Sequence, residues 1–230
     1  MKQDSDQVYY RDAGALPFAK RVSRRARLGI FQLFNEIMQP QRGDVVLDVG
    51  VSSEMSQEAN ILEKYYPYPE NIVCASTSDG ASILREFPAV RHVTIQPNAS
   101  LPFEDRQFSI GYSNAVIEHV GSREQQAHFI SEMLRVSEKI FIVFPNRLFP
   151  IEHHTALPLL HMLPMPAFRW LLRGTRYDYW AHEENLNLLF AWDAARLVPS
   201  RLELGLRYAG IGLGPFRSNI LLYRESLQSN

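Results

Sequence analysis

The chain has 230 residues, of which 46% are hydrophobic, and its formal net charge is −1. A chain of this size can bury one full core, so we expect a single domain over residues 1–230. The near-neutral charge gives no reason to expect a nucleic-acid partner. The single cysteine, Cys74, excludes an intramolecular disulfide and fits a reducing compartment. No apolar stretch reaches the roughly 18 residues of a transmembrane segment, and residues 1–12 are unlike a signal peptide. We therefore expect a cytoplasmic protein.

Residues 15–38 carry apolar side chains at helical spacing, which predicts an amphipathic helix that ends before Pro40 and Gly43. Its basic residues could meet phosphate groups or an anionic membrane surface. A solvated helix face explains the same charges without a ligand, and we favour that interpretation. The basic residues are Lys20, Arg21, Arg24, Arg25 and Arg27.

The stretch GDVVLDVG, residues 43–50, predicts a strand buried on both faces of a parallel sheet. Gly50 would let the chain turn sharply, where a ligand can approach bare backbone. A helix is expected after the turn, with Ser52 or Ser53 as its N-cap. Its apolar positions at helical spacing are Met55, Ala59, Leu62 and Tyr66. Strand, turn and helix together are typical of a nucleotide-type binding site.

Strands and helices alternate along the rest of the chain. Ser122 and Gln125 form a capping box that starts one of the helices. A glycine-rich stretch, residues 210–214, joins the last two strands into an antiparallel pair. The further expected strands are 72–75, 92–95, 109–113, 139–144, 202–208 and 218–224, with a short helix at 81–86. This order predicts an α/β three-layer sandwich around a Rossmann-like, seven-stranded, mostly parallel sheet with a C-terminal antiparallel hairpin.

Residues 146–182 follow a different pattern, in which four prolines alternate with aromatic residues and histidines. Long irregular insertions in compact domains are usually lids or binding loops. We therefore expect this segment to be an inserted lid on the substrate side.

Residues 46–145 resemble a class I S-adenosylmethionine-dependent methyltransferase, of the type 11-like group. The resemblance is carried mainly by LPFEDRQFSIGYSNAVIEHV, residues 101–120, which follows the family's pattern of LPF, acidic, aromatic, strand and apolar-Glu-His. Residues 1–40 are similar to the family's N-terminal helical lid, and residues 219–223 to its last strand. The Pro-Asn-Arg turn at 145–147, leading into an acidic and histidine-containing loop, resembles a bacterial subset of the family.

The resemblance implies S-adenosylmethionine as cofactor and S-adenosylhomocysteine as product, and we expect no metal. Asp48 would orient the first loop and the cofactor's amino end, Ser76 would stand at the ribose and Asn98 at the adenine. The implied cofactor-binding residues are Asp48, Gly50, Val51, Ser52, Ser76, Thr77, Asn98, Ala99, Leu101, Ser113 and Asn114. The chain departs from the family's pattern at the second loop glycine, the ribose carboxylate and the adenine carboxylate.

Methyl transfer from a sulfonium needs positioning and desolvation, and a base only when the acceptor is an unactivated hydroxyl. Imidazole titrates near neutral pH, so the candidate bases are His119, His153 and His154, and Glu152 precedes the last two. The candidate catalytic residues are His119, Glu152 and His154. Alternatively, His119 is structural, and Glu152 and His154 brace the loop. Along the chain, no histidines and cysteines have the spacing of a zinc site.

The first hypothesis is a methyltransferase acting on a small-molecule or glycolipid-like acceptor at oxygen. The alternative is a non-catalytic methyltransferase-like binding or scaffold protein, which the three altered cofactor signals favour. A third reading, an NAD-dependent dehydrogenase, shares the first strand and turn but lacks glycines for a pyrophosphate.

Overall fold

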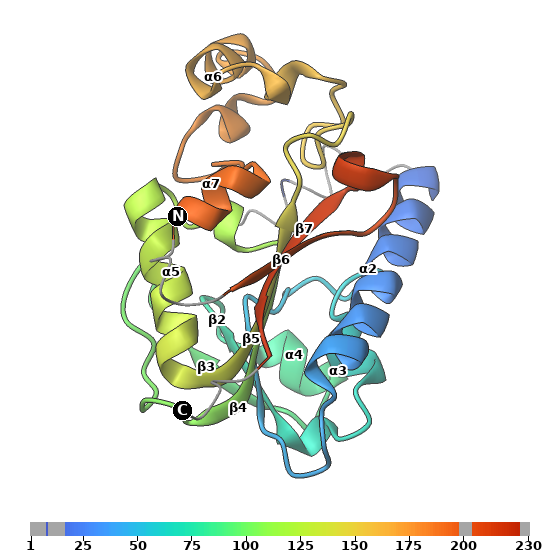
Figure 1. Cartoon of the computed structure of the whole chain (residues 1–230), viewed down its shortest axis with the longest axis vertical. Helices are drawn as coiled ribbons and strands as arrows, with labels where there is room; N and C mark the ends of the chain where they lie inside the picture. Colours follow the sequence, from blue (N-terminus) through green and yellow to red (C-terminus); the bar gives the residue numbers. More distant parts are fainter. Residues whose placement is uncertain (1–7, 9–16, 198–203, 226–230) are drawn as a thin grey trace.

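The computed structural model describes residue 8 and residues 17–197 and 204–225. Its centre is a seven-stranded sheet with the order β3-β2-β1-β4-β5-β7-β6 (Figure 1). β1 to β5 pair in parallel, and β7 is antiparallel to both of its neighbours. The strands are β1 (Val46–Val49), β2 (Ile72–Ser76), β3 (Arg91–Thr94), β4 (Phe108–Asn114), β5 (Ser137–Pro145), β6 (Gly205–Ala209) and β7 (Asn219–Arg224). The predicted mostly parallel sheet with an antiparallel C-terminal hairpin is confirmed.

Helices cover both faces of this sheet, which gives the predicted three layers (Figure 1). α5 (Arg123–Val136) and α7 (Ala191–Arg196) pack on the face that carries Leu47 and Val49. α2 (Pro17–Met38), α3 (Ile61–Tyr65) and α4 (Ala81–Glu86) pack on the face that carries Val46. Neighbouring residues of β1 therefore belong to opposite cores, as the two-residue period of a strand requires.

The first long helix, α2, is part of the core layer over its C-terminal half. The ring of Phe34 is fully buried and makes edge contacts with Tyr112, at 5.5 Å, and Phe141, at 5.4 Å. In the N-terminal half Arg21, Arg24 and Arg25 are exposed, as expected of a solvated face. Within the described residues, no helix has the length and apolarity needed to span a bilayer. A lid role for residues 1–40 stays a prediction.

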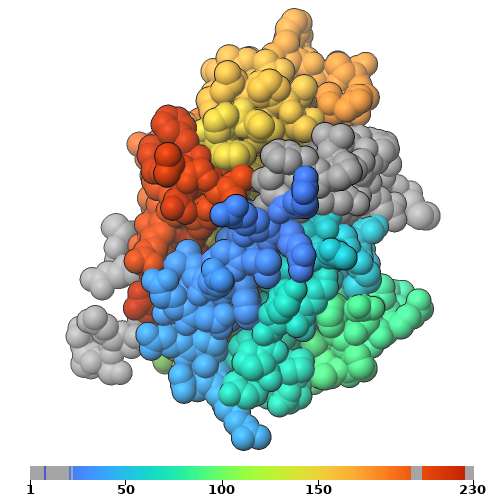
Figure 2. Space-filling view, turned by 90° about the vertical axis from the view of Figure 1, so that its right-hand side faces the viewer, coloured from blue at the N-terminus to red at the C-terminus, as the bar shows by residue number. Residues whose placement is uncertain are grey.

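Residues 146–182 form a lobe beyond the carboxyl edge of the parallel strands (Figures 1 and 2). The lobe contains η3 (Leu160–Met162), α6 (Met165–Leu172) and η4 (Asp178–Ala181). It has a small core of its own, made of Val8, Phe168, Leu172, Trp180, Ala181, Leu186 and Leu188. Buried Arg147 holds its base, because its guanidinium donates to the carbonyls of His161, at 2.7 Å, and Leu163, and lies over the ring of Phe190 at 4.4 Å.

The local predictions differ from the structure mainly after β1. A helix follows the turn as expected, but its expected N-cap at Ser52 or Ser53 is wrong, because α3 begins only at Ile61 and its N-cap is Asn60. Asn60 has a left-handed backbone, with φ 52°, and Met55 is exposed instead of facing the core. Helix α7 was not predicted. Part of the expected strand 202–208 lies outside the described residues, and β6 is seen from Gly205.

Candidate functional site

The turn after β1 is built so that only glycine fits at position 50. Gly50 has φ +96°, and its amide donates to the carbonyl of Ala75 on β2, at 2.8 Å. A Cβ at this position would lie 2.1 Å from Cγ2 of Val116. Gly50 is nevertheless exposed, whereas Val51 is buried in the core beneath α2. The turn therefore presents backbone at the carboxyl edge of the sheet, where ligands bind in open α/β folds.

The loop between Gly50 and α3 is held by side chains instead of by helical hydrogen bonds. The amide of Asn60 both accepts from the N–H of Ser52, at 3.1 Å, and donates to its carbonyl, at 3.0 Å. Lys64 donates to the carbonyl of Ser56, at 2.6 Å. Arg27 donates to the carbonyl of Glu58, at 2.9 Å, so this member of the basic helix has a structural contact.

Asp48 is buried beneath this turn, next to Glu63 of α3. Burial, followed by the neighbouring Glu63 carboxylate, raises the pKa of Asp48 well above its usual value. The thiol of Cys74 lies 3.6 Å from Oε1 of Glu63. Both effects, burial and the Glu63 carboxylate, favour the protonated form of the Asp48 carboxyl group. Glu63 was not predicted as a site residue, because its proximity to Asp48 depends on where α3 begins.

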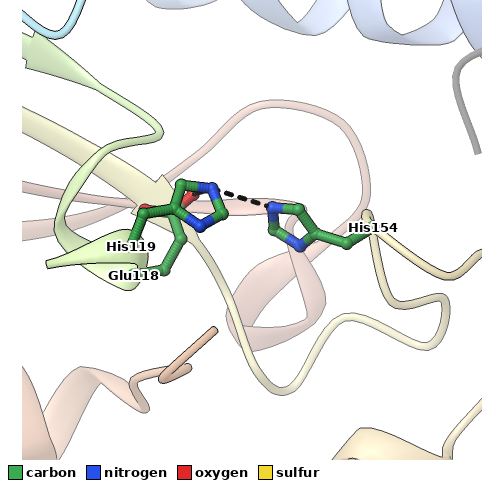
Figure 3. Close-up of side chains that lie close together, drawn as sticks. All are labelled: Glu118, His119 and His154. Atoms are coloured by element: carbon green, nitrogen blue, oxygen red, sulfur yellow. Dashed lines mark hydrogen bonds and ion pairs between the residues drawn. The ribbon is translucent and has the colours of Figure 1, made fainter. Parts of the chain in front are cut away.

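The three predicted catalytic residues lie together, although His119 precedes His154 by 35 residues. Val116, whose side chain lies against the glycine turn, leads directly into η2 (Ile117–His119). Nε2 of His119 lies 3.2 Å from Nε2 of His154, and Nδ1 of His154 lies 2.7 Å from Oε1 of Glu152. Figure 3 shows the two imidazoles facing each other through these nitrogens.

Glu152 is an ionised, buried carboxylate. Its Oε2 accepts from the N–H of His154, at 2.9 Å, and from the N–H and the hydroxyl of Thr155, at 2.6 and 2.8 Å. Burial by itself would raise the pKa of Glu152, but His154 and these hydrogen bonds hold it well below its usual value. Because an ionised carboxylate only accepts, Nδ1 of His154 carries a proton.

His119 is fixed in the same way, because its Nδ1 donates to the carbonyl of Asn185 at 2.6 Å. Burial lowers the pKa of His119 to about 3, so its ring is neutral at pH 7. Trp180 packs against both rings, with centroid distances of 5.9 Å to His119 and 4.7 Å to His154. The third candidate base, His153, points elsewhere, and its Nε2 lies 3.1 Å from the carbonyl of Ser218.

Glu118 also belongs to this cluster and was not predicted. Its side chain is 1% exposed, and neither carboxylate oxygen has a hydrogen-bond partner among the described residues. Oε1 lies 3.9 Å from Nε2 of His119. Burial raises the pKa of Glu118 to about 7. The signal that could have found it was the IEH triplet, in which an acidic residue directly precedes a candidate catalytic histidine.

Comparisons with known proteins place this geometry in a fold family. No protein-family profile and no curated protein matches the chain. A SAM-dependent methyltransferase from Aquifex aeolicus has a TM-score of 0.56 at 12% identity, over 96% of this chain and 98% of its own. One from Thermotoga maritima, described as a possible histamine N-methyltransferase, has a TM-score of 0.58 at 12% identity over the same shares. The small RNA methyltransferase HEN1 has a TM-score of 0.55 at 15% identity, over 88% of this chain and 25% of its own. The chain has the class I methyltransferase fold.

In this methyltransferase fold, the predicted cofactor residues divide into two groups. Those that form the exposed edge beside the turn are Gly50, Thr77, Asn98 and Ala99, with Ser52 and Asn114 half-buried. Those that are buried are Asp48, Val51, Ser76, Leu101 and Ser113. The edge thus offers mainly backbone, hydroxyl and amide groups to a ligand.

Two of the buried hydroxyls are engaged within the methyltransferase fold. Oγ of Ser76 lies 2.9 Å from Nε2 of His92 and 2.8 Å from Oγ of Ser78. Ser113 donates to the carbonyl of Val49 at 2.8 Å, which ties β4 to β1. Ser113 thus supports the sheet under the turn, and a ribose contact at Ser76 would compete with His92.

Proposed function

We propose that this protein is an S-adenosylmethionine-dependent methyltransferase that acts on a hydroxyl of a small-molecule or glycolipid-like acceptor. The observation that carries the proposal is the link, through Val116, between the glycine turn and the cluster of His119, Glu152 and His154. Val116 touches the glycine turn and leads within three residues to His119, which meets the Glu152–His154 pair. A cofactor position and a proton acceptor would therefore lie side by side.

The glycine turn supports cofactor binding in this proposal. Gly50 is exposed at the carboxyl edge, and the position that a side chain would take is filled by Val116, so a ligand would have to approach the backbone from another side. A ligand could approach its backbone, with Thr77, Asn98 and Ala99 at the same edge. The burial of Val51 in the core and the exposure of Met55 support an accessible turn. When bound, the cofactor would supply an electrophilic methyl group on a sulfonium.

The histidine cluster supports oxygen as the methylated atom. A hydroxyl must lose its proton as it attacks, and a positioned base contributes about 10²- to 10⁴-fold to such a step. Glu152 fixes the Nδ1–H tautomer of His154, so the lone pair of that ring is on Nε2, toward the cluster. This is the arrangement of a base that a carboxylate orients.

The acceptor class rests on the inserted lobe and on charge. Residues 146–182, which we propose as the substrate-side lid, are rich in proline and aromatic residues and lie over the carboxyl edge. Such a surface suits an apolar or ring-containing molecule. The net charge of −1 gives no electrostatic support for a nucleic-acid acceptor.

Calorimetry with S-adenosylhomocysteine tests the cofactor part. We expect binding to the wild type and loss of binding in Gly50→Ala, with Gly29→Ala as the matched control because that helical glycine has nothing within 4 Å of its Cβ position. No binding by the wild type at millimolar ligand would refute the proposal. An acceptor screen with radiolabelled S-adenosylmethionine would then compare the wild type with Glu152→Gln, for which we expect a fall in kcat of about 10²-fold or more.

A non-catalytic binding role is the second candidate, and the loop after β1 favours it. This loop has no helix start near Gly50, and side chains of the protein hold its backbone groups. Binding of S-adenosylhomocysteine without turnover of any acceptor would support this candidate. Methyl transfer to any acceptor would exclude it.

A further inference from the structure

Three side chains around η2 bring metal-ligating atoms to one point. Glu118, His119 and His154 each offer one ligand atom, and these atoms all lie within 4.8 Å of one another. Glu118 and His154 are buried and His119 is half-buried. The cluster joins a turn anchored on the sheet to a loop of the inserted lobe (Figure 3).

The hydrogen bonds of the two imidazoles determine where their lone pairs point. Nδ1 of His119 faces the carbonyl of Asn185, and Nδ1 of His154 faces the Glu152 carboxylate. Both partners only accept, so both Nδ1 atoms carry protons, and in the neutral rings both lone pairs are on Nε2. These two Nε2 atoms face each other at 3.2 Å. Two lone pairs repel at this distance unless a proton or a cation lies between them.

The position of Glu118 favours a cation over a proton between the two Nε2 atoms. A proton shared by the two imidazoles would leave the Glu118 carboxylate buried with no hydrogen-bond partner, which is costly. A cation would give all three groups a partner at once. The nitrogen separation also agrees, because two ligands about 2.1 Å from an ion lie roughly 3.0 to 3.4 Å apart in octahedral or tetrahedral geometry.

The surroundings resemble the outer shell that orients metal ligands. Metal-bound histidines usually donate their other N–H to a carboxylate or a backbone carbonyl, and here Glu152 and Asn185 accept these bonds. Thr155 in turn fixes Glu152, and Trp180 packs on both rings. The ligand atoms are therefore held in place without relying on one another.

We propose that Glu118, His119 Nε2 and His154 Nε2 bind a divalent first-row transition-metal ion, such as zinc, manganese or iron(II). Two imidazoles and one carboxylate suit these ions better than Mg²⁺ or Ca²⁺, which prefer oxygen ligands throughout. Three protein ligands leave positions open for water or for an oxygen of a substrate. The proposal goes beyond the methyltransferase assignment and does not rest on it, although an ion here would replace His154 as the group that acts on an acceptor hydroxyl.

Metal titration of the full chain, stripped with EDTA and without cofactor or acceptor, tests the site. We expect one Zn²⁺ per chain in competition with a chromophoric chelator, a ligand-field absorption spectrum with Co²⁺, and no comparable binding of Mg²⁺. His119→Gln and His154→Gln are expected to lose the Co²⁺ spectrum. Glu152→Gln, which changes only an outer-shell partner, is expected to bind about 10- to 100-fold more weakly.

His128→Gln, at an exposed histidine outside the cluster, is the control and is expected to bind like the wild type. Circular dichroism establishes that each variant is folded. The proposal is overturned if the wild type binds no ion stoichiometrically, if both cluster histidine variants retain the Co²⁺ spectrum, or if His128→Gln loses it. Binding of S-adenosylhomocysteine is measured separately, so failure of the metal site and failure of the methyltransferase proposal give different results.

Discussion

Replacing Glu118 by Gln should stabilise the metal-free protein while weakening its response to metal. The carboxylate is 1% exposed and has no hydrogen-bond partner among the described residues. An unsatisfied buried polar group costs about 1–3 kcal/mol, and a charged one costs more. Gln has the same shape and no charge, so we expect a gain of about 2 kcal/mol in EDTA. In a chain of this length, that gain corresponds to a rise in Tm of roughly 4–8 °C.

In the presence of zinc, the wild type should gain more stability than Glu118→Gln. If the substitution weakens binding about 100-fold, the zinc-induced stabilisation of the wild type should exceed that of the variant by about 2.7 kcal/mol, or roughly 5–11 °C in Tm. Thermal unfolding followed by circular dichroism, in EDTA and in excess Zn²⁺, measures both effects. Glu138→Gln, at an exposed position of β5, is the matched control and should change neither.

Two results would refute this reasoning. A metal-free Glu118→Gln variant less stable than the wild type would mean that the carboxylate has a favourable partner in the folded chain. An equal zinc-induced rise in Tm for both proteins would mean that Glu118 does not bind the ion.

Three further predictions concern stability. Gly50→Ala should lower the free energy of unfolding in urea by about 1–3 kcal/mol, because the positive φ and the contact of a Cβ with Val116 are both unfavourable. Gly29→Ala should instead raise the free energy of unfolding by up to about 1 kcal/mol. Similar values for the two variants would contradict the geometry of the turn. Glu132→Gln should cost about 1–3 kcal/mol at pH 7. Its pKa is lowered mainly by a hydrogen bond from Arg135, so its contribution is present above the ordinary value of 4.5 and lost as the pH falls through the lowered value. The difference in free energy of unfolding between Glu132→Gln and the wild type should therefore shrink in acid. A difference that does not change with pH would argue against a stabilising Glu132–Arg135 pair. Arg147→Met should leave the carbonyls of His161 and Leu163 without their hydrogen-bond donor and should therefore speed proteolysis within residues 146–182. Cleavage at the wild-type rate would disprove this prediction.

The sheet could be predicted from the sequence because its signals are local. The runs at 72–75 and 139–144 are short and densely apolar, which indicates buried parallel strands. The capping box at Ser122 and Gln125 has both of its hydrogen bonds, at 2.7 and 3.4 Å, and α5 begins directly after it. Each of these features involves residues that are close in sequence.

The loop after Gly50 could not be predicted, because longer-range contacts decide its shape. Apolar spacing from Met55 to Tyr66 is compatible with a helix. The Asn60 amide instead bonds to Ser52, eight residues earlier, and Arg27 reaches the same loop from α2. Tertiary contacts here override the local helical pattern, so the expected N-cap was misplaced.

The histidine cluster was predicted in its members but not in its arrangement. Residue type and position along the chain point to His119, Glu152 and His154. Their meeting depends on how residues 146–182 dock against η2, which no local pattern specifies. Glu118 was missed because an acidic residue after a strand is ordinarily a surface residue, and only the folded chain shows that it is buried.

The separate core of the lobe has an evolutionary consequence. Phe168, Leu172 and Trp180 pack with one another and with Leu186 and Leu188, whereas the two sheet cores are made of other side chains. Substitutions among the lobe's own core side chains should therefore leave the packing of the two sheet cores unchanged. We expect homologous chains to vary more at these core positions of the lobe than at Arg147, Glu152 and His154, which tie the lobe to the rest of the chain.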